Sequence, residues 1–435
     1  EDEYTGEKIG SKLERIREMM KENGCNAHVL SSLDDIAWLL NIRGNDIAYC
    51  PLVLSYAIVY NNSVELFADI RKFSDDIINL LAENQVKIYP YEDIYRKVSE
   101  MTSEDKLLLD SAIMNYSLYQ AISKETVIVD KQNPEILMKS VKNETQAENL
   151  RKAHLKDAVA HTKFMYWLKK NIGRVEITEL SASARLEGLR AEQEHFLGPS
   201  FGPISAYGEH GAIVHYSADE KSNVPLKEGK LFMTDTGGHY LEGSTDITRT
   251  VALGEVGNIE KEHFTLVARA MLRLANTVFL YGCSGANLDC IAREVFWKEG
   301  LNFNHGTGHG VGYLLNIHEG PINFRWKEGE RPAPALEENM VITDEPGIYI
   351  EGSHGIRLEN ELLVRKTVKN EYGQFMNFEI LTYVPIDLDA ILPEKMSTEE
   401  KEMLNHYHKQ VYEKVSPYLS EEERIWLKEY TRAVK

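Results

Sequence analysis

Short apolar segments alternate with amphipathic ones through residues 1–135 of the chain. The apolar segments have the length of buried strands, whereas the segments between them carry apolar residues at helical spacing. We predict strands at residues 27–30, 55–60, 64–68, 86–89, 106–109 and 126–129, and helices at residues 34–40, 73–83, 92–101 and 112–122. A further helix is predicted from Ser11, which forms a capping-box pattern with Glu14, to Gly24. This order indicates a small α/β domain.

From Glu135 onward the amphipathic segments are longer, and their order repeats. The first set comprises helices at 144–170 and 179–192, a strand that ends at 212–215, and a hairpin at 230–253 with Gly237, Gly238 and Gly243 as turn residues. The second set comprises helices at 261–279 and 286–298, a stretch rich in glycine and histidine, and a hairpin at 340–364. The repeated order predicts two related halves that face each other across a site. A charged helical tail is expected from residue 398.

The composition of the 435 residues is that of a globular protein, with 43% hydrophobic and 27% charged residues. This length allows two or three domains and a sizeable core. The formal net charge of −19 argues against nucleic acid or an anionic membrane as the main partner. The longest apolar run, at residues 51–60, is too short to span a bilayer. We therefore expect no nucleic acid and no membrane among the partners.

The four cysteines are few for a chain of this length, and none forms a C-x-x-C pair. Such usage is typical of a reducing compartment rather than of a disulfide framework. The acidic residues 1–3 show no signal peptide, so the expected location is the cytoplasm. The sequence also lacks an initiator Met, and an upstream targeting signal missing from it would overturn this expectation.

The stretch 305–312 places His305 and His309 among glycines, and His318 follows in a His-Glu-Gly-Pro segment. Glycine has no Cβ, so backbone and imidazoles can crowd around a reacting group. Imidazole binds metals or moves protons near neutral pH. The glycines do not fit the G-x-G-x-x-G or P-loop patterns of phosphate cradles. No H-E-x-x-H or G-x-S-x-G motif supports a zincin or a serine hydrolase of the nucleophile-elbow type.

Four carboxylates stand in strand-like contexts around these histidines: Asp235, Asp246, Glu345 and Glu359. Asp235 and Asp246 flank the first predicted hairpin turn, and paired antiparallel strands can bring them within a few Å of each other. Along a strand, successive side chains point to opposite faces. This alternation predicts that Arg357 points to the same side as Glu359.

Together with His309, the four carboxylates form an oxygen-rich set that suits two divalent ions, with Mn²⁺ favoured and Co²⁺ or Zn²⁺ as alternatives. Two divalent ions would balance the four negative charges, which would otherwise repel one another. Each residue alone has another explanation, because aspartates often form turns and His309 could be a buried, hydrogen-bonded histidine. The combination of all five favours a metal site.

The segments that carry these residues resemble the pita-bread metallopeptidases, and among them the aminopeptidase P (Xaa-Pro aminopeptidase) family. The resembling segments are residues 211–216, 235–237, 245–250, 305–312, 316–321, 343–347 and 356–360. The histidine stretch and the His-Glu-Gly-Pro at 318–321 look most like aminopeptidase P. The family usually has Asp-Ser-Gly where this chain has Asp235-Thr236-Gly237, a change that leaves the ligand intact.

The resemblance implies a dinuclear metal site in which Glu345 helps to deprotonate a bridging water to hydroxide. The implied metal ligands are Asp235, Asp246, His309, Glu345 and Glu359. Three histidines would line the site as hydrogen-bond donors and proton shuttles, supported by Tyr349 and Arg357. The implied catalytic and substrate-binding residues are Glu345, His215, His305, His318, Tyr349 and Arg357.

The implied fold class is α/β (α+β), with a small creatinase-like domain at residues 1–135. A pita-bread catalytic domain with pseudo-two-fold halves would follow at residues 136–435, with a helical extension from about residue 398. Residues 1–135 resemble the middle domain of three-domain relatives, whose first domain has no counterpart in this sequence.

The implied function is hydrolysis of the N-terminal Xaa-Pro bond of peptides. The partners would then be peptides with proline at the second position, and the resemblance also implies a homodimer. A prolidase limited to Xaa-Pro dipeptides is the nearest alternative. A non-enzymatic binding protein on the same fold is a second one, which the presence of all five ligands disfavours.

Overall fold

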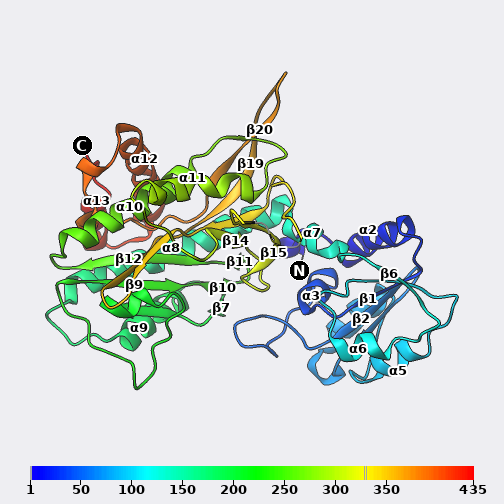
Figure 1. Cartoon of the computed structure of the whole chain (residues 1–435). Helices are drawn as coiled ribbons and strands as arrows, with labels where there is room; N and C mark the ends of the chain where they lie inside the picture. The colour runs from blue at the N-terminus through cyan, green and yellow to red at the C-terminus, as the bar shows by residue number, and fades with distance from the viewer. Residues whose placement is uncertain (1, 328, 330) are drawn as a thin grey trace. The chain divides into compact units, whose positions relative to one another are not determined.

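The computed structural model describes every residue except 1, 328 and 330, and it forms two compact units at residues 1–139 and 140–435 (Figure 1). Each unit has hydrophobic clusters of its own. Among the described residues, no helix combines the length and the apolar character that crossing a bilayer requires.

The first unit is built on a six-stranded sheet in the order β4-β3-β2-β1-β5-β6. Its central strand β1 is buried along its whole length. It pairs antiparallel with β2 and parallel with β5. The strands are β1 (Ala27–Leu30), β2 (Tyr56–Tyr60), β3 (Val64–Phe67), β4 (Val86–Tyr89), β5 (Lys106–Leu109) and β6 (Val127–Asp130). The helices are α1 (Asp2–Thr5), α2 (Ile9–Glu22), α3 (Leu33–Leu39), η1 (Ile70–Lys72), α4 (Asp75–Glu83), α5 (Asp93–Ser99), α6 (Tyr116–Ala121) and α7 (Pro134–Ser140). Every predicted strand and helix of this region is present within a few residues of its expected bounds.

Helix α2 begins at Ile9, so the predicted start at Ser11 is wrong. The Ser11 hydroxyl does not cap the helix but donates a hydrogen bond to Glu7 at 2.7 Å. Ile9 is buried and begins the apolar stripe that continues through Leu13 and Ile16. Burial of this stripe extends the helix by about half a turn beyond the expected cap.

The second unit contains two successive sets of two helices followed by antiparallel strands, as the repeated order predicts (Figure 1). The first set is α8 (Glu144–Asn171), α9 (Glu179–Ala191), β7 (Phe196–Pro199), β8 (Ile204–Tyr207), η2 (Gly208–Ala212), β9 (Lys230–Thr236), β10 (Gly238–Tyr240), β11 (Gly243–Ser244) and β12 (Ile247–Leu253). The second is α10 (Asn258–Ala275), β13 (Phe279–Leu280), α11 (Gly285–Trp297), β14 (Gly308–Gly310), β15 (Glu319–Phe324), β16 (Val341–Asp344), β17 (Gly347–Ile350), β18 (His354–Arg357), β19 (Asn360–Asn370) and β20 (Gly373–Ile380). The tail forms η3 (Leu388–Ala390), η4 (Pro393–Lys395), α12 (Thr398–Val415), η5 (Ser416–Tyr418) and α13 (Glu421–Tyr430).

The strand predicted to end at residues 212–215 is present as β8 but ends earlier, at Tyr207, and the 3₁₀ helix η2 follows it. The predicted hairpin at 230–253 is present as β9 paired with β12. Neither Gly237 nor Gly238 is a turn residue: Gly237 lies between β9 and β10, where a Cβ would overlap the carbonyl oxygen of Thr245, and Gly238 begins β10. The strands instead continue as β10 and β11, and Gly243 adopts a φ of 135° where they meet.

Arg249 on β12 joins the strands of the second unit to helix α12 of its tail. The guanidinium is fully buried and donates to the carbonyl oxygens of Glu359 at 2.6 Å and Val384 at 2.9 Å. It also donates to the hydroxyl of Tyr407, on α12, at 2.8 Å. Helix α12 is therefore part of the core of this unit.

Replacing Arg249 with Met is expected to lower the free energy of unfolding by about 2–4 kcal/mol, because buried carbonyl groups lose their donor. The measurement is urea unfolding followed by tryptophan fluorescence. Arg174→Met, at an exposed arginine of the same unit, is the control and is expected to change stability by no more than about 0.5 kcal/mol. Equal urea midpoints for the two variants would contradict this role of Arg249.

Candidate metal centre

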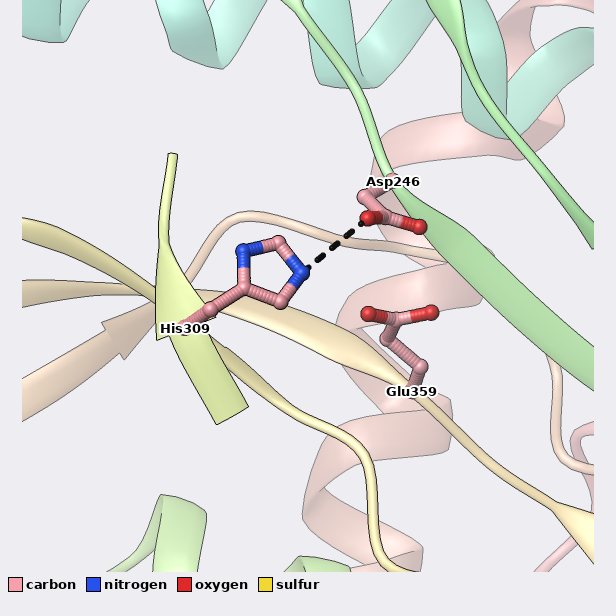
Figure 2. A group of neighbouring side chains, drawn as sticks. All are labelled: Asp246, His309 and Glu359. Atoms are coloured by element: carbon pink, nitrogen blue, oxygen red, sulfur yellow. Dashed lines mark ion pairs between the residues drawn. The ribbon is translucent and has the colours of Figure 1, made fainter. Parts of the chain in front are cut away.

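Asp246, His309 and Glu359 point toward one another from three different segments of the second unit (Figure 2). One ligand atom from each lies within 4.8 Å of the others. Asp246 directly precedes β12, His309 lies on β14, and Glu359 lies between β18 and β19. The Nε2 atom of His309 is 3.5 Å from Asp246 Oδ2, a separation that a shared metal ion can bridge.

Asp235 and Glu345, the other two expected ligands, line the same cavity, which has a volume of about 370 Å³. Asp235 lies on β9 opposite Thr248 of β12, so strand pairing brings it close to Asp246. Glu345 follows β16, and its Oε1 lies 3.7 Å from His309 Nε2. The structure thus gathers all five residues expected to bind metal.

The hydrogen bonds of His309 leave the correct nitrogen available for a metal. Its Nδ1–H donates to the Gly310 carbonyl at 2.8 Å, because a carbonyl oxygen can only accept. In the neutral form of this ring, Nε2 presents its lone pair toward Asp246 and Glu345. A backbone partner of this kind fixes the tautomer of a metal-binding histidine.

Crowding makes these carboxylates hard to ionise without cations. Burial, together with repulsion by Asp235 and Glu345, raises the pKa of Asp246 well above its ordinary value. Burial and the same crowding raise the pKa of Glu359 well above its usual range, and burial raises that of Glu345. Among the described residues, the buried atoms Asp235 Oδ1 and Glu359 Oε1 have no hydrogen-bond partner. Unpaired acceptors in such a cluster fit divalent cations.

Arg357 holds one oxygen of Asp235 and leaves the other unpaired. Its Nη2 and Nε donate to Asp235 Oδ2 at 2.5 and 3.1 Å. Its Nη1 donates to the hydroxyl of Tyr349 at 2.7 Å. Thr248 donates to Glu359 Oε2 at 2.7 Å and lies 3.4 Å from Arg357 Nε, so Arg357 and Glu359 point to the same side, as the alternation predicts.

Both ring nitrogens of His305 are engaged within the protein. Nδ1–H donates to the Gly306 carbonyl at 2.7 Å, and Nε2 lies 2.8 Å from the hydroxyl of Tyr349. Burial lowers the pKa of His305 to about 4, so the ring is neutral at neutral pH and Nε2 accepts. Burial also raises the pKa of Tyr349 to about 12, which keeps the proton that this hydroxyl donates.

His215 and His318 also line the cavity, together with Asp235, Asp246, His309 and Glu345. The ring of His318 lies 4.4 Å from that of His309, centroid to centroid. Burial, with the nearby His309, lowers the pKa of His318 to about 4. At neutral pH His318 is therefore a neutral imidazole.

Three further residues act on the expected ligands but were not singled out from the sequence. Thr248 donates to Glu359, and Thr343 donates to Glu345 Oε1 at 3.2 Å. Glu361 Oε1 accepts the backbone N–H of Asp246 at 2.7 Å. Strand alternation could have found Thr248 and Glu361, because each lies two residues beyond an expected ligand.

Comparison with known protein families covers nearly the whole chain. The description "Metallopeptidase family M24" matches residues 148–366, and "Creatinase/Prolidase N-terminal domain" matches residues 1–146. "C-terminal region of peptidase_M24" matches residues 374–434.

Curated relatives and solved structures agree with these matches. Aminopeptidase P1 of Arabidopsis thaliana is 34% identical over 99% of this chain and 74% of its own length. Xaa-Pro aminopeptidase 1 of Dictyostelium discoideum is 36% identical over 96% of this chain and 67% of its own length. The crystal structure of X-prolyl aminopeptidase from Caenorhabditis elegans has a TM-score of 0.94 and 34% identity, covering 100% of this chain and 72% of that one. Given these relatives and the family matches, the chain belongs to metallopeptidase family M24, in its aminopeptidase P branch.

Proposed function

We propose that this protein is a metal-dependent aminopeptidase that cleaves the bond between the first residue of a peptide and a proline at the second position. The observation that carries the proposal is the cluster of buried carboxylates with unpaired oxygens beside His215 and His318. Relatives of 34–36% identity that match this chain nearly end to end are named Xaa-Pro aminopeptidases or aminopeptidase P.

We propose that the residues of the cluster hold two divalent cations. The proposed ligands are Asp235, Asp246, His309, Glu345 and Glu359. Four carboxylates and one imidazole suit Mn²⁺, with Co²⁺ or Zn²⁺ as alternatives. When bound, such ions polarise a carbonyl group and lower the pKa of a bound water. The C. elegans structure is described as a cytosolic enzyme with a di-nuclear active site. We propose that this protein also binds two metal ions and is also cytosolic.

The protein's own residues supply orientation and proton transfer. Glu345, on the cavity wall, is placed to accept a proton from the attacking water and to return it to the departing proline nitrogen. His215 and His318 are placed to donate hydrogen bonds to the substrate. His305 positions Tyr349, because both of its ring nitrogens are already engaged.

The carboxylate-rich lining of the cavity also favours action at the amino terminus. A free substrate amine donates hydrogen bonds and fits the carboxylate oxygens that line the cavity, even when bound cations balance their charge. An Xaa-Pro bond lacks the N–H that peptidases commonly bind, so its cleavage depends on contacts to the carbonyl and to the terminal amine. Both features support removal of a single first residue.

A prolidase restricted to dipeptides is the second candidate. The Xaa-Pro dipeptidase of Bacillus anthracis has a TM-score of 0.69 and 25% identity, covering 87% of this chain and 99% of that one. The higher similarity to aminopeptidases P favours longer substrates.

We further propose that the protein forms a homodimer, as the family resemblance implies.

The first test is cleavage of an Xaa-Pro-Xaa tripeptide and the matching Xaa-Pro dipeptide by the Mn²⁺-loaded protein, followed by mass spectrometry. We expect release of the first residue from the tripeptide, with slower or no cleavage of the dipeptide. Glu345→Gln is expected to lower kcat by at least about 100-fold, since it removes the proton acceptor. Cleavage of the dipeptide alone would favour a prolidase, and an intact tripeptide would refute the aminopeptidase.

The second test concerns the pH dependence of the metal-free protein. The folded-state pKa values of Asp246 and Glu359 lie above their unfolded values. The resulting loss of folding stability is therefore absent below about pH 4, where both states are protonated, and grows as pH rises. We therefore expect chelator-treated protein to lose stability as pH rises from 5 to 8, by about 1.4 kcal/mol per pH unit for each group that stays protonated.

The control for that test is Glu359→Gln, which cannot ionise and is expected to show a shallower slope than the wild-type protein. Thermal unfolding at several pH values, with and without added Mn²⁺, measures the difference. Added metal is expected to stabilise the wild-type protein more at pH 8 than at pH 5, because it displaces protons. Parallel slopes for the wild type and the variant would contradict the raised pKa of Glu359.

A further inference from the structure

The carboxylate of Glu179 lies beneath the loop that carries His215. Glu179 is the first residue of α9, and its side chain is fully buried. Its Oε1 accepts the backbone N–H of Tyr207 at 2.7 Å and Nδ1–H of His210 at 2.8 Å. Its Oε2 accepts the hydroxyl of Tyr216 at 2.9 Å. One carboxylate therefore binds the loop 207–216 at its beginning, within η2 and at its end.

The surroundings of this carboxylate are equally well ordered. The carbonyl of Glu179 accepts the hydroxyl of Ser205 at 2.7 Å, and its N–H donates to the Val224 carbonyl at 3.2 Å. The rings of His210 and Tyr216 stack at a centroid distance of 4.5 Å. The loop is thus held on an anchor that is fixed through its own backbone.

The same loop supplies part of the cavity wall. Val214 and His215 line the cavity together with the expected metal ligands. The Val214 carbonyl accepts a hydrogen bond from Nη2 of Arg357 at 3.4 Å. Gly211 packs against Gly355 so closely that a Cβ at Gly355 would overlap the Gly211 carbonyl. A shift of this loop would therefore displace His215 relative to Arg357 and the metal centre.

The chemistry of the anchor favours a carboxylate. All three of its partners donate to it, and a carboxylate accepts at both oxygens. A glutamine has the same shape, but its NH₂ group would face either the donors of Tyr207 and His210 or the Tyr216 hydroxyl, whose proton would then have only the Ser222 carbonyl, at 3.3 Å, as its acceptor. A buried donor without an acceptor is costly, so the loop would rearrange to find another partner.

We propose that Glu179 is a positioning residue for His215, which sets the reach of this imidazole into the cavity without itself touching the substrate. The proposal rests on the proposed peptidase function for its activity readout. Displacement of a reacting or binding group by about 1 Å can cost about 100-fold in rate. A modest change in the loop is therefore sufficient to affect catalysis while leaving the five expected ligands in place.

The test compares Glu179→Gln, His215→Ala and the double variant, with Glu192→Gln, an exposed glutamate after the same helix, as the matched control. We expect Glu179→Gln to lower kcat/KM on an Xaa-Pro-Xaa peptide by about 10- to 100-fold. In the His215→Ala background the same change is expected to cost less than about 3-fold, because the group that it positions is already absent. The kcat/KM of Glu192→Gln is expected to remain within about 2-fold of the wild-type value.

Several outcomes would overturn the proposal. A full additional loss in the double variant would show that Glu179 acts through something other than His215. Wild-type kcat/KM in Glu179→Gln would show that the anchor does not affect catalysis. If Glu179→Gln does not fold, Tyr216→Phe removes one donor and leaves the carboxylate in place. It is expected to give a smaller loss, which must also disappear in the His215→Ala background.

A readout that does not depend on activity separates this proposal from the proposed function. The imidazole ¹⁵N signals of His215, assigned by their absence in His215→Ala, report the surroundings of the ring. They are expected to shift in Glu179→Gln and to stay unchanged in Glu192→Gln. A wild-type protein that leaves Xaa-Pro peptides intact would refute the peptidase, whereas unshifted His215 signals in Glu179→Gln would refute the positioning role.

Discussion

Negative charge confined to a small buried cavity is the constraint around which the second unit is organised. The four carboxylates lie at or next to the ends of β9, β12, β16 and β19. These strands come from both halves of the unit and must converge to assemble the cluster. Repulsion among the carboxylates opposes this arrangement, and the fold opposes the repulsion with fixed donors such as Arg357 and the hydroxyl of Thr248. Among the described residues, Asp235 Oδ1 and Glu359 Oε1 still have no hydrogen-bond partner, as suits the proposed cations.

Features that depend on neighbouring residues could be predicted from the sequence, whereas features that depend on distant contacts could not. Strand alternation places Arg357 and Glu359 on one side without knowledge of the fold, and the structure agrees. The start of α2 and the conformation after β8 could not be predicted in this way. The first depends on the burial of Ile9, and the second on contacts of Glu179 and Gly355 with residues far away in the sequence.

Histidines show most clearly where a residue pattern is insufficient. His305 and His309 lie in similar glycine-rich surroundings, and each donates Nδ1–H to the carbonyl of the next residue. The Nε2 atom of His309 faces two carboxylates, whereas that of His305 faces the hydroxyl of Tyr349. The partner of the second nitrogen distinguishes a candidate metal ligand from a residue that orients its neighbour, and only the three-dimensional structure identifies that partner.

The burial of Arg249 bears on how this protein can be shortened or redesigned. Its guanidinium bonds the backbone of Glu359 on one side and the Tyr407 hydroxyl of α12 on the other. A truncation that removed α12 would take away one partner of this buried charge beside the backbone of Glu359, a proposed metal ligand. Helix α12 is therefore not a removable appendage, and a minimal catalytic fragment would have to retain it.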